Sequence, residues 1–352
     1  MLPLSQRIRG AAPKLQAWWD HEEQSTPCLL LTGPAPGARP VSVPEDLDRY
    51  WFDVDGLVTR AMQGLEGQAW YGAALPYHWP DWGASTFAGV LGAEMEAIDR
   101  ITFWTRPCCT ALEQVREVEV DYEARFGRTV LETTRRSVAC SRDHHFVAVY
   151  PMVGIADTLA ALYGTVPLLT AMVDRPTATK AALRHLTGLW LREFDRICSL
   201  IESGGNEGHM TWMAIWAPDR ACATQEDFSY MISDAMFREF CLPPLVELVE
   251  SLPYAMYHLD GAGALSHLDT LLGIHRLRAI QWVPGAGRER VPQWYGLIRR
   301  ILAAGKSVEV FARPEEIDDL VREVGPRGLL IHCGGVSPDQ AARLLERYPQ
   351  GA

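Results

Sequence analysis

The segment YAMYHLD at Tyr254–Asp260 is a short, largely apolar run. It ends at Gly261, and a stretch with helical apolar spacing comes after it. Four more runs of this kind lie in the C-terminal half, at residues 208–215, 278–283, 307–311 and 328–333. Each is rich in β-branched or aromatic residues, and each precedes Gly, Pro or Asp and then a helical pattern. Such alternation is typical of successive strand–helix units, so the sequence predicts an α/β fold with parallel strands.

Residues able to bind a ligand or move a proton lie at the ends of these runs. They are Trp212, Trp216, His258, Asp260, Gln281, Trp282, Phe311, Arg313, His332 and Cys333. In a parallel βα barrel the active site lies at the C-terminal ends of the strands. The sequence therefore predicts an active-site rim built from these positions.

Composition narrows the class of protein. The chain has 352 residues, of which 48% are hydrophobic and 22% charged, and this suits one soluble domain over 1–352, with helices, a first strand and a rim loop over 1–90. The 33 basic and 44 acidic residues give a net charge of −11 without a Lys or Arg run, so a nucleic-acid partner is not expected. No apolar stretch resembles a signal or a membrane span, so we expect a cytoplasmic protein that does not contact a membrane.

The eight cysteines form no CxxC pair, which favours reduced core residues. The N-terminal half is less regular than the C-terminal half. There we expect a helix, a strand and a turn region at 15–22, 28–32 and 33–44, an aromatic loop at 70–84, a strand at 147–151, and helices at 157–169 and 176–202.

Three segments together resemble the uroporphyrinogen decarboxylase superfamily. They are residues 151–187, the DFS motif at 227–229 with the downstream Phe and Pro residues to 243, and the YHLDG motif at 257–261. The similarity extends over most of the chain from about residue 90. It implies a single (β/α)8 TIM-type barrel with N-terminal helical additions. It also implies either porphyrinogen decarboxylation or zinc-dependent methyl transfer with a corrinoid protein.

The motifs favour the methyltransferase branch of this superfamily. The decarboxylases carry an Arg-rich motif near the N-terminus, whereas residues 28–40 contain only Arg39. The zinc site of the methyltransferases uses a His-x-Cys motif and a later Cys-Gly, which His258-x-Asp260 and Cys333-Gly334 resemble. The resemblance thus implies a site for zinc or another divalent metal at His258, Asp260 and Cys333, with Gln281 as a further catalytic candidate.

The chemistry of that set is self-consistent. Residues two apart on a strand point to the same side, so His258 and Asp260 can approach one ion. Three protein ligands leave a zinc position open, where a thiol can lose its proton or a methyl ether can be activated for transfer to a partner's corrinoid. A carboxylate in place of a thiolate makes the site harder and favours other divalent metals.

Twelve tryptophans are a second indication of ligand binding. Those predicted at loops or strand ends, and therefore as substrate-binding residues, are Trp79, Trp82, Trp212, Trp216 and Trp282. Aromatic rings at a barrel mouth suit a flat or methylated small molecule through stacking or cation–π contact. We expect Trp79 or Trp82 to share one cavity with Trp212, His258, Gln281 and Cys333.

The leading hypothesis is a metal-dependent methyltransferase for a small methylated substrate or thiol, with a corrinoid protein as partner. Two alternatives stay open: a metal-free decarboxylase or lyase, in which a buried His or Asp protonates a carbanion, and a non-catalytic barrel that binds a small molecule. The pair His144-His145 falls in a predicted connection and is a weaker candidate for function. A homodimer is a possible assembly that the sequence does not decide.

Overall fold

A seven-stranded sheet organises the computed structural model, which describes residues 2–285, 287 and 290–350. Its strand order is β2-β1-β13-β12-β11-β10-β9, and all neighbours are parallel except β2, which runs antiparallel to β1. The strands are β1 Cys28–Pro34, β2 Gln68–Gly72, β9 Ala221–Thr224, β10 Tyr254–Asp260, β11 Leu277–Val283, β12 Ser307–Phe311 and β13 Leu329–Cys333. The predicted α/β class is confirmed. The sheet ends at β2 and β9 in the described part of the chain, so a closed (β/α)8 barrel is not confirmed.

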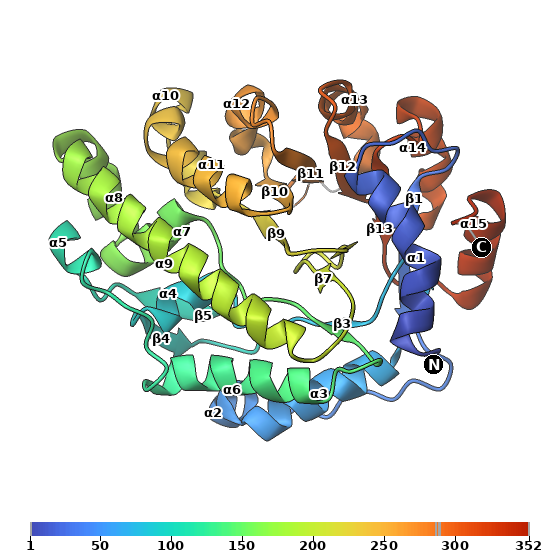
Figure 1. Cartoon of the computed structure of the whole chain (residues 1–352), viewed down its shortest axis with the longest axis horizontal. Helices are drawn as coiled ribbons and strands as arrows, with labels where there is room; N and C mark the ends of the chain where they lie inside the picture. The colour runs from blue at the N-terminus through green and yellow to red at the C-terminus, as the bar shows by residue number, and fades with distance from the viewer. Residues whose placement is uncertain (1, 286, 288–289, 351–352) are drawn as a thin grey trace.

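Helices follow the parallel strands, as short crossover connections require. Figure 1 shows α11 to α15 succeeding one another along the outside of the sheet. The helices are α1 Leu4–Trp19, α2 Leu47–Phe52, α3 Val54–Glu66, α4 Thr86–Val90, α5 Leu112–Val115, α6 Arg125–Ala139, α7 Ile155–Tyr163, α8 Thr165–Asp174, α9 Pro176–Glu202, α10 Asp234–Met236, α11 Leu242–Ser251, α12 Leu268–Leu272, α13 Tyr295–Ala303, α14 Ile317–Val324 and α15 Pro338–Arg347. The remaining short strands are β3 Tyr77–His78, β4 Glu94–Ala97, β5 Phe103–Arg106, β6 Phe146–Val147, β7 His209–Met210 and β8 Trp216–Ala217.

The sheet has two buried faces, because alternate residues of a strand point in opposite directions. The outer face, which carries Leu329 and Ile331, packs in the same apolar cluster as the helices that follow the strands. The inner face carries Leu30, Met256 and Leu330, which pack in a second cluster with α1. Parity along each strand therefore decides whether a side chain meets a helix or the interior.

Helix α1 closes the interior at the N-terminal ends of the strands. Its Trp18 Nε1 donates to the Val308 carbonyl at 3.2 Å, and the Ser307 hydroxyl donates to the Trp18 carbonyl at 2.5 Å. Trp19 Nε1 donates to the Trp216 carbonyl at 2.9 Å. The C-terminal ends of the strands are left as the route by which a ligand reaches the interior.

Four of the five C-terminal runs are confirmed as neighbouring parallel strands, and the run at 208–215 is wrong. It contains only β7, which pairs antiparallel with β8, and β9 takes its place in the sheet. Ala214 has φ 62°, a left-handed turn that ends the extended run. The sequence ACAT of β9 is too short and too small to stand out as an apolar strand.

Most N-terminal predictions are close to the structure. The predicted strand at 28–32 is β1, the helix at 176–202 is α9, and the helix at 15–22 overlaps the last part of α1, which ends at Trp19. The strand predicted over 147–151 is wrong beyond Val147, the last residue of β6. The helix predicted over 157–169 is broken at Gly164, whose φ of 103° is incompatible with a helix, into α7 and α8. The loop predicted over 70–84 includes the end of β2 and all of β3.

No single helix in the described ranges is long and apolar enough to cross a membrane. The pair α7 and α8 reaches the required length and composition only together, across a bend of 109°.

Replacing Leu15 tests the role of α1 as the closure of the interior. Leu15 is 0% exposed, so Leu15→Ala should lower the free energy of unfolding by about 2–5 kcal/mol through lost burial and a cavity. Leu2, just before α1, is 57% exposed, and Leu2→Ala should change it by less than about 0.5 kcal/mol. Urea denaturation of both variants measures the difference, and equal effects would contradict this role for α1.

Candidate active site

Four polar side chains form a row on the inner face of the sheet near its C-terminal edge. His258 of β10 is level with Gln281 of β11, and Gln281 is level with Glu309 of β12. Glu309 pairs in register with Leu330 of β13, so His332 lies one inward position further along. We call His258, Gln281, Glu309 and His332 the inner-face polar row.

Hydrogen bonds join the row from end to end. Gln281 Nε2 donates to Glu309 Oε2 at 2.9 Å, and Gln281 Oε1 is hydrogen bonded to His258 Nδ1. His332 Nδ1 lies 3.4 Å from Glu309 Oε1. A carboxylate only accepts hydrogen bonds, so Glu309 fixes the direction of the Gln281 amide.

The direction of these bonds sets the tautomers of both histidines. Because Gln281 turns its carbonyl oxygen toward His258, His258 must donate from Nδ1, and its Nε2 keeps a free lone pair. His332 likewise donates from Nδ1 to Glu309. In its neutral form each histidine therefore presents Nε2 as a proton acceptor. Glu309 and Gln281 are both 0% exposed, and the two donors compensate the buried carboxylate.

A cavity of about 310 Å³ lies at the His332 end of the row. We call it the inner cavity; its lining is Thr32, Ala61, Gly64, Leu65, Gln68, Trp70, Tyr77, His78, Trp79, Ala214 and His332. No Asp, Glu, Lys or Arg is among these described residues. Burial, followed by the nearby Glu309 charge, raises the pKa of Tyr77 to about 12, so its hydroxyl stays protonated. Uncharged donors and aromatic rings suit an uncharged ligand that has an oxygen or nitrogen acceptor.

Two tryptophans link the inner cavity to His258. Trp79 lines the cavity and stacks on Trp212, with ring centroids 5.2 Å apart. Trp212 meets the His258 ring at 5.2 Å in an edge-on arrangement. Their indole N–H groups donate to the carbonyls of Val149 and Ala223 at 3.1 and 2.8 Å. Both rings are therefore held in place rather than free to collapse into the cavity.

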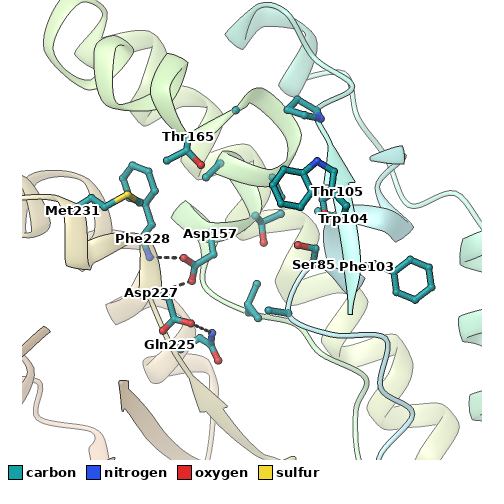
Figure 2. Close-up of a pocket in the computed structure, with 18 residues that line it drawn as sticks. Ser85, Phe103, Trp104, Thr105, Asp157, Thr165, Gln225, Asp227, Phe228 and Met231 are labelled. Atoms are coloured by element: carbon teal, nitrogen blue, oxygen red, sulfur yellow. Dashed lines mark hydrogen bonds between the residues drawn. The ribbon is translucent and has the colours of Figure 1, made fainter. Parts of the chain in front are cut away.

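Carboxylates gather at the rim beyond the His258 end. Figure 2 shows Asp157 of α7 accepting from the backbone N–H groups of Asp227 and Phe228, at 3.0 and 2.6 Å. Glu226 accepts from the first N–H groups of α7, those of Ile155 and Ala156, at 2.9 and 3.0 Å. The loop after β9 therefore caps α7 with the Glu226 carboxylate, which the positive end of a helix favours, and Asp157 of α7 in turn holds the backbone of the loop.

The close packing of this loop on α7 depends on Gly154. A Cβ at this position would lie 2.1 Å from the Gln225 carbonyl oxygen, so no other residue fits there without a shift of the backbone. Asp157 and Asp227 also line a cavity of about 510 Å³, with Trp104 and Phe103 of β5 on its far side (Figure 2).

The pKa values of these rim carboxyls are all raised. Burial, followed by the Asp227 charge, raises the pKa of Asp157 to about 7. Burial and then Asp157 raise the pKa of Glu226 well above its ordinary value. Burial also raises the pKa of Asp227, although the nearby His258 opposes the shift. Of these carboxyls, Asp157 therefore binds a proton near neutral pH.

The structure brings some predicted site residues together and not others. Trp79, Trp212, His258 and Gln281 lie along the inner face, as described. The other three tryptophans lie elsewhere: Trp82 is buried among the N-terminal helices and donates to the Trp51 carbonyl, Trp216 packs by α1 at the closed end, and Trp282 points to the outer face. Strand parity accounts for Trp282 and the hairpin of β7 and β8 for Trp216, and composition reveals neither.

Cys333 does not join His258 and Asp260. It is one residue beyond the inward His332, so it points to the outer face, where it is 1% exposed within the helix-packed cluster. Burial raises its pKa to about 11. Asp260 is exposed at the end of β10 and lines a third cavity with Asp227. In residues 2–285, 287 and 290–350, no three His, Cys, Asp or Glu side chains are grouped as metal ligands. The set inferred from the resemblance does not fit a zinc ion.

Glu309 is the site residue that sequence reasoning missed, together with the inward position of His332. The run SVEVF at Ser307–Phe311 carries a signal, since a lone Glu inside a buried apolar strand is rare unless it has partners. Strand parity shows which residues of β13 share a face, but it does not show that His332 lies beside Glu309 of β12. That depends on the register between the two strands, which one sequence does not reveal.

Comparison with known proteins finds a similar fold. A methyltransferase from Methanosarcina mazei matches with a TM-score of 0.63 over 99% of this chain and 98% of that chain. The sequence identity is 12%, so the similarity concerns the fold. No family model and no curated sequence matches the chain, and membership of the uroporphyrinogen decarboxylase superfamily stays a prediction.

The raised carboxyl pKa values predict a pH dependence of stability. The folded chain holds these protons more tightly than the unfolded chain does. The stabilisation is therefore full below about pH 4 and is lost as the pH rises through the Asp157 pKa of about 7. Asp227→Asn removes a repelling charge and should lower the Asp157 pKa. Each unit by which the Asp157 pKa falls restores about 1.4 kcal/mol of folding stability at higher pH.

Thermal melts between pH 5 and pH 8 test this. Relative to wild type, Asp227→Asn should lose less stability across that range. Glu45→Gln, which removes one charge from an exposed loop position, serves as the control and should follow wild type. If the Asp227 variant loses as much stability as wild type, its charge does not act on Asp157.

Proposed function

We propose that this chain is an enzyme that transfers a methyl group to or from a small uncharged molecule bound in the inner cavity. The observation that carries the proposal is the inner-face polar row, in which Glu309 lies beside Nδ1 of His332, a residue of the cavity wall. The fold similarity to a methyltransferase along nearly the full length of both chains supports the type of reaction.

In this proposal His332 is the acid–base residue. When a substrate N–H, O–H or S–H group is methylated, His332 Nε2 accepts the proton, and the electron pair of the broken X–H bond forms the new bond to the methyl carbon. The bond between that carbon and the methyl donor breaks, and its electron pair stays with the donor. Glu309, bonded to Nδ1, stabilises the imidazolium that results. In the reverse direction the imidazolium protonates the departing group.

The remaining residues orient the substrate and the base. The hydroxyl of Tyr77 and the rings of Trp79 and Trp70 bound the cavity, so they hold a flat or small polar molecule against His332. Gln281 and His258 continue the hydrogen-bond row on the far side of Glu309 and fix the position of its carboxylate.

A partner that carries the methyl group fits the surface of the rim. A corrinoid on such a protein supplies or takes up the methyl group. Three large apolar side chains at the rim are exposed: Trp104 at 65%, Tyr230 at 61% and Phe311 at 47%. Such residues give a partner an apolar contact area. Because the ligand set tested above does not fit zinc, we assign no step to a metal.

Decarboxylation has less support from the cavities. A substrate carboxylate needs a cationic partner, yet no Lys or Arg is among the described residues that line the three cavities around the rim. The pKa of Asp157 near 7 suits a general acid, but Asp157 lines the cavity of about 510 Å³ and not the inner cavity.

Methylcobalamin, with a panel of small thiols, amines and phenols as acceptors, tests the proposal. Mass spectrometry of the products should detect one methylated acceptor. His332→Gln should lower the rate about 10²–10⁴-fold, the usual contribution of a general acid or base. His275→Gln, at an exposed position away from the rim, should retain the wild-type rate. A His332→Gln enzyme as fast as wild type, or no methylated product from any acceptor, would overturn the proposal.

A further inference from the structure

A second chain of hydrogen bonds leaves the inner cavity at His78. His78 of β3, which lines the cavity, has Nδ1 2.7 Å from the Ser137 hydroxyl oxygen. That oxygen lies 3.5 Å from His145 Nε2, and His145 Nδ1 lies 3.1 Å from His144 Nδ1. The four residues come from a strand, a helix and a turn, so tertiary packing brings them together.

The chain joins the cavity to solvent through buried groups. Ser137 and His145 are both 0% exposed, whereas His144 is exposed. His145 uses both ring nitrogens within the chain, one toward Ser137 and one toward His144. An imidazole bonded in this way can receive a proton on one nitrogen and release one from the other, and a hydroxyl can do the same.

The far end lies away from the rim. His144 follows Asp143, whose carbonyl and carboxylate accept from the Leu4 and Ser5 N–H groups at the start of α1. That helix covers the N-terminal ends of the strands. A partner protein that docks over the rim would therefore cover the mouth of the cavity and leave His144 in contact with water.

We propose that His78, Ser137, His145 and His144 form a proton path between the inner cavity and solvent. For each methyl group that replaces hydrogen on the substrate, the proton taken up by His332 crosses the inner cavity, which His332 and His78 both line, and the path carries it outward. In the reverse reaction the path carries one proton inward. A proton added to His78 at the cavity releases the Nδ1 proton to Ser137, which passes its own to His145, and His145 passes one to His144 and water. No group is oxidised or reduced.

The resting charge of the path agrees with this role. Burial lowers the pKa of His78 to about 4, and burial with the neighbouring His78 and His144 lowers the pKa of His145 to about 3. Both rings are neutral near pH 7, so the path holds no excess proton between transfers and can accept one from either end.

Ser137→Ala breaks the path and leaves all three histidines. Ser141→Ala is the matched control, because Ser141 is also buried near the end of α6, and its hydroxyl donates to the Val138 carbonyl outside the path. In full-length protein labelled with ¹⁵N-histidine, NMR measures the exchange of the His78 Nδ1 proton with solvent. Ser137→Ala should slow this exchange at least tenfold, and Ser141→Ala should not change it. Unchanged exchange in Ser137→Ala overturns the path.

A kinetic measurement relates the path to the proposed function, on which its purpose rests. At low buffer concentration, Ser137→Ala should lower kcat for methyl transfer at least tenfold with little change in KM, and added imidazole should restore it. A loss that imidazole does not restore would contradict the path and indicate a structural role for Ser137. The exchange experiment needs no substrate, so it tests the path even if methyl transfer is not the reaction.

Discussion

The carboxylate of Glu309 is the group on which the polar interior depends. It is fully buried and accepts hydrogen bonds from both neighbours. Its charge is therefore compensated only if Gln281 points its amide nitrogen toward Glu309 and His332 points its Nδ1 proton toward Glu309. The same requirement decides the tautomer of His258. Because the Gln281 amide nitrogen faces Glu309, its carbonyl oxygen faces Nδ1 of His258. Removing the carboxylate would leave three side chains without a fixed direction, because each takes its orientation from the next.

Much of the C-terminal fold could be predicted because its strands are alike in sequence. The runs that became β10, β11, β12 and β13 are largely apolar, rich in β-branched or aromatic residues and ended by turn residues, and these features reflect burial on both faces of a parallel sheet. The long helix α9 was predictable for the same reason, since its apolar spacing is local. Features that depend only on neighbouring residues survive in one sequence.

The candidate site was only partly predictable, because it depends on parity and register. His258 and Gln281 were found at strand ends, but Cys333 differs from the inward His332 by a single residue and therefore points to the helices. Trp216 was assigned to a strand end that is instead a hairpin beside α1. The link from His78 through Ser137 joins residues 59 apart in sequence, and no local pattern reports it.

The contrast between the uncharged inner cavity and the acidic rim has a consequence for what leaves the protein. Methylation of a tertiary amine or a thioether, which has no N–H or S–H proton to give to His332, creates a cation, and a cation in the inner cavity would have no carboxylate among the described lining residues to balance it. Asp157, Asp227 and Asp260 line the other two cavities around the rim, where a carboxyl group that has lost its proton attracts positive charge. Before methylation such a substrate would favour the uncharged inner cavity, and after methylation the cationic product would favour the acidic rim. The charge acquired in the reaction would then drive the product toward the exit.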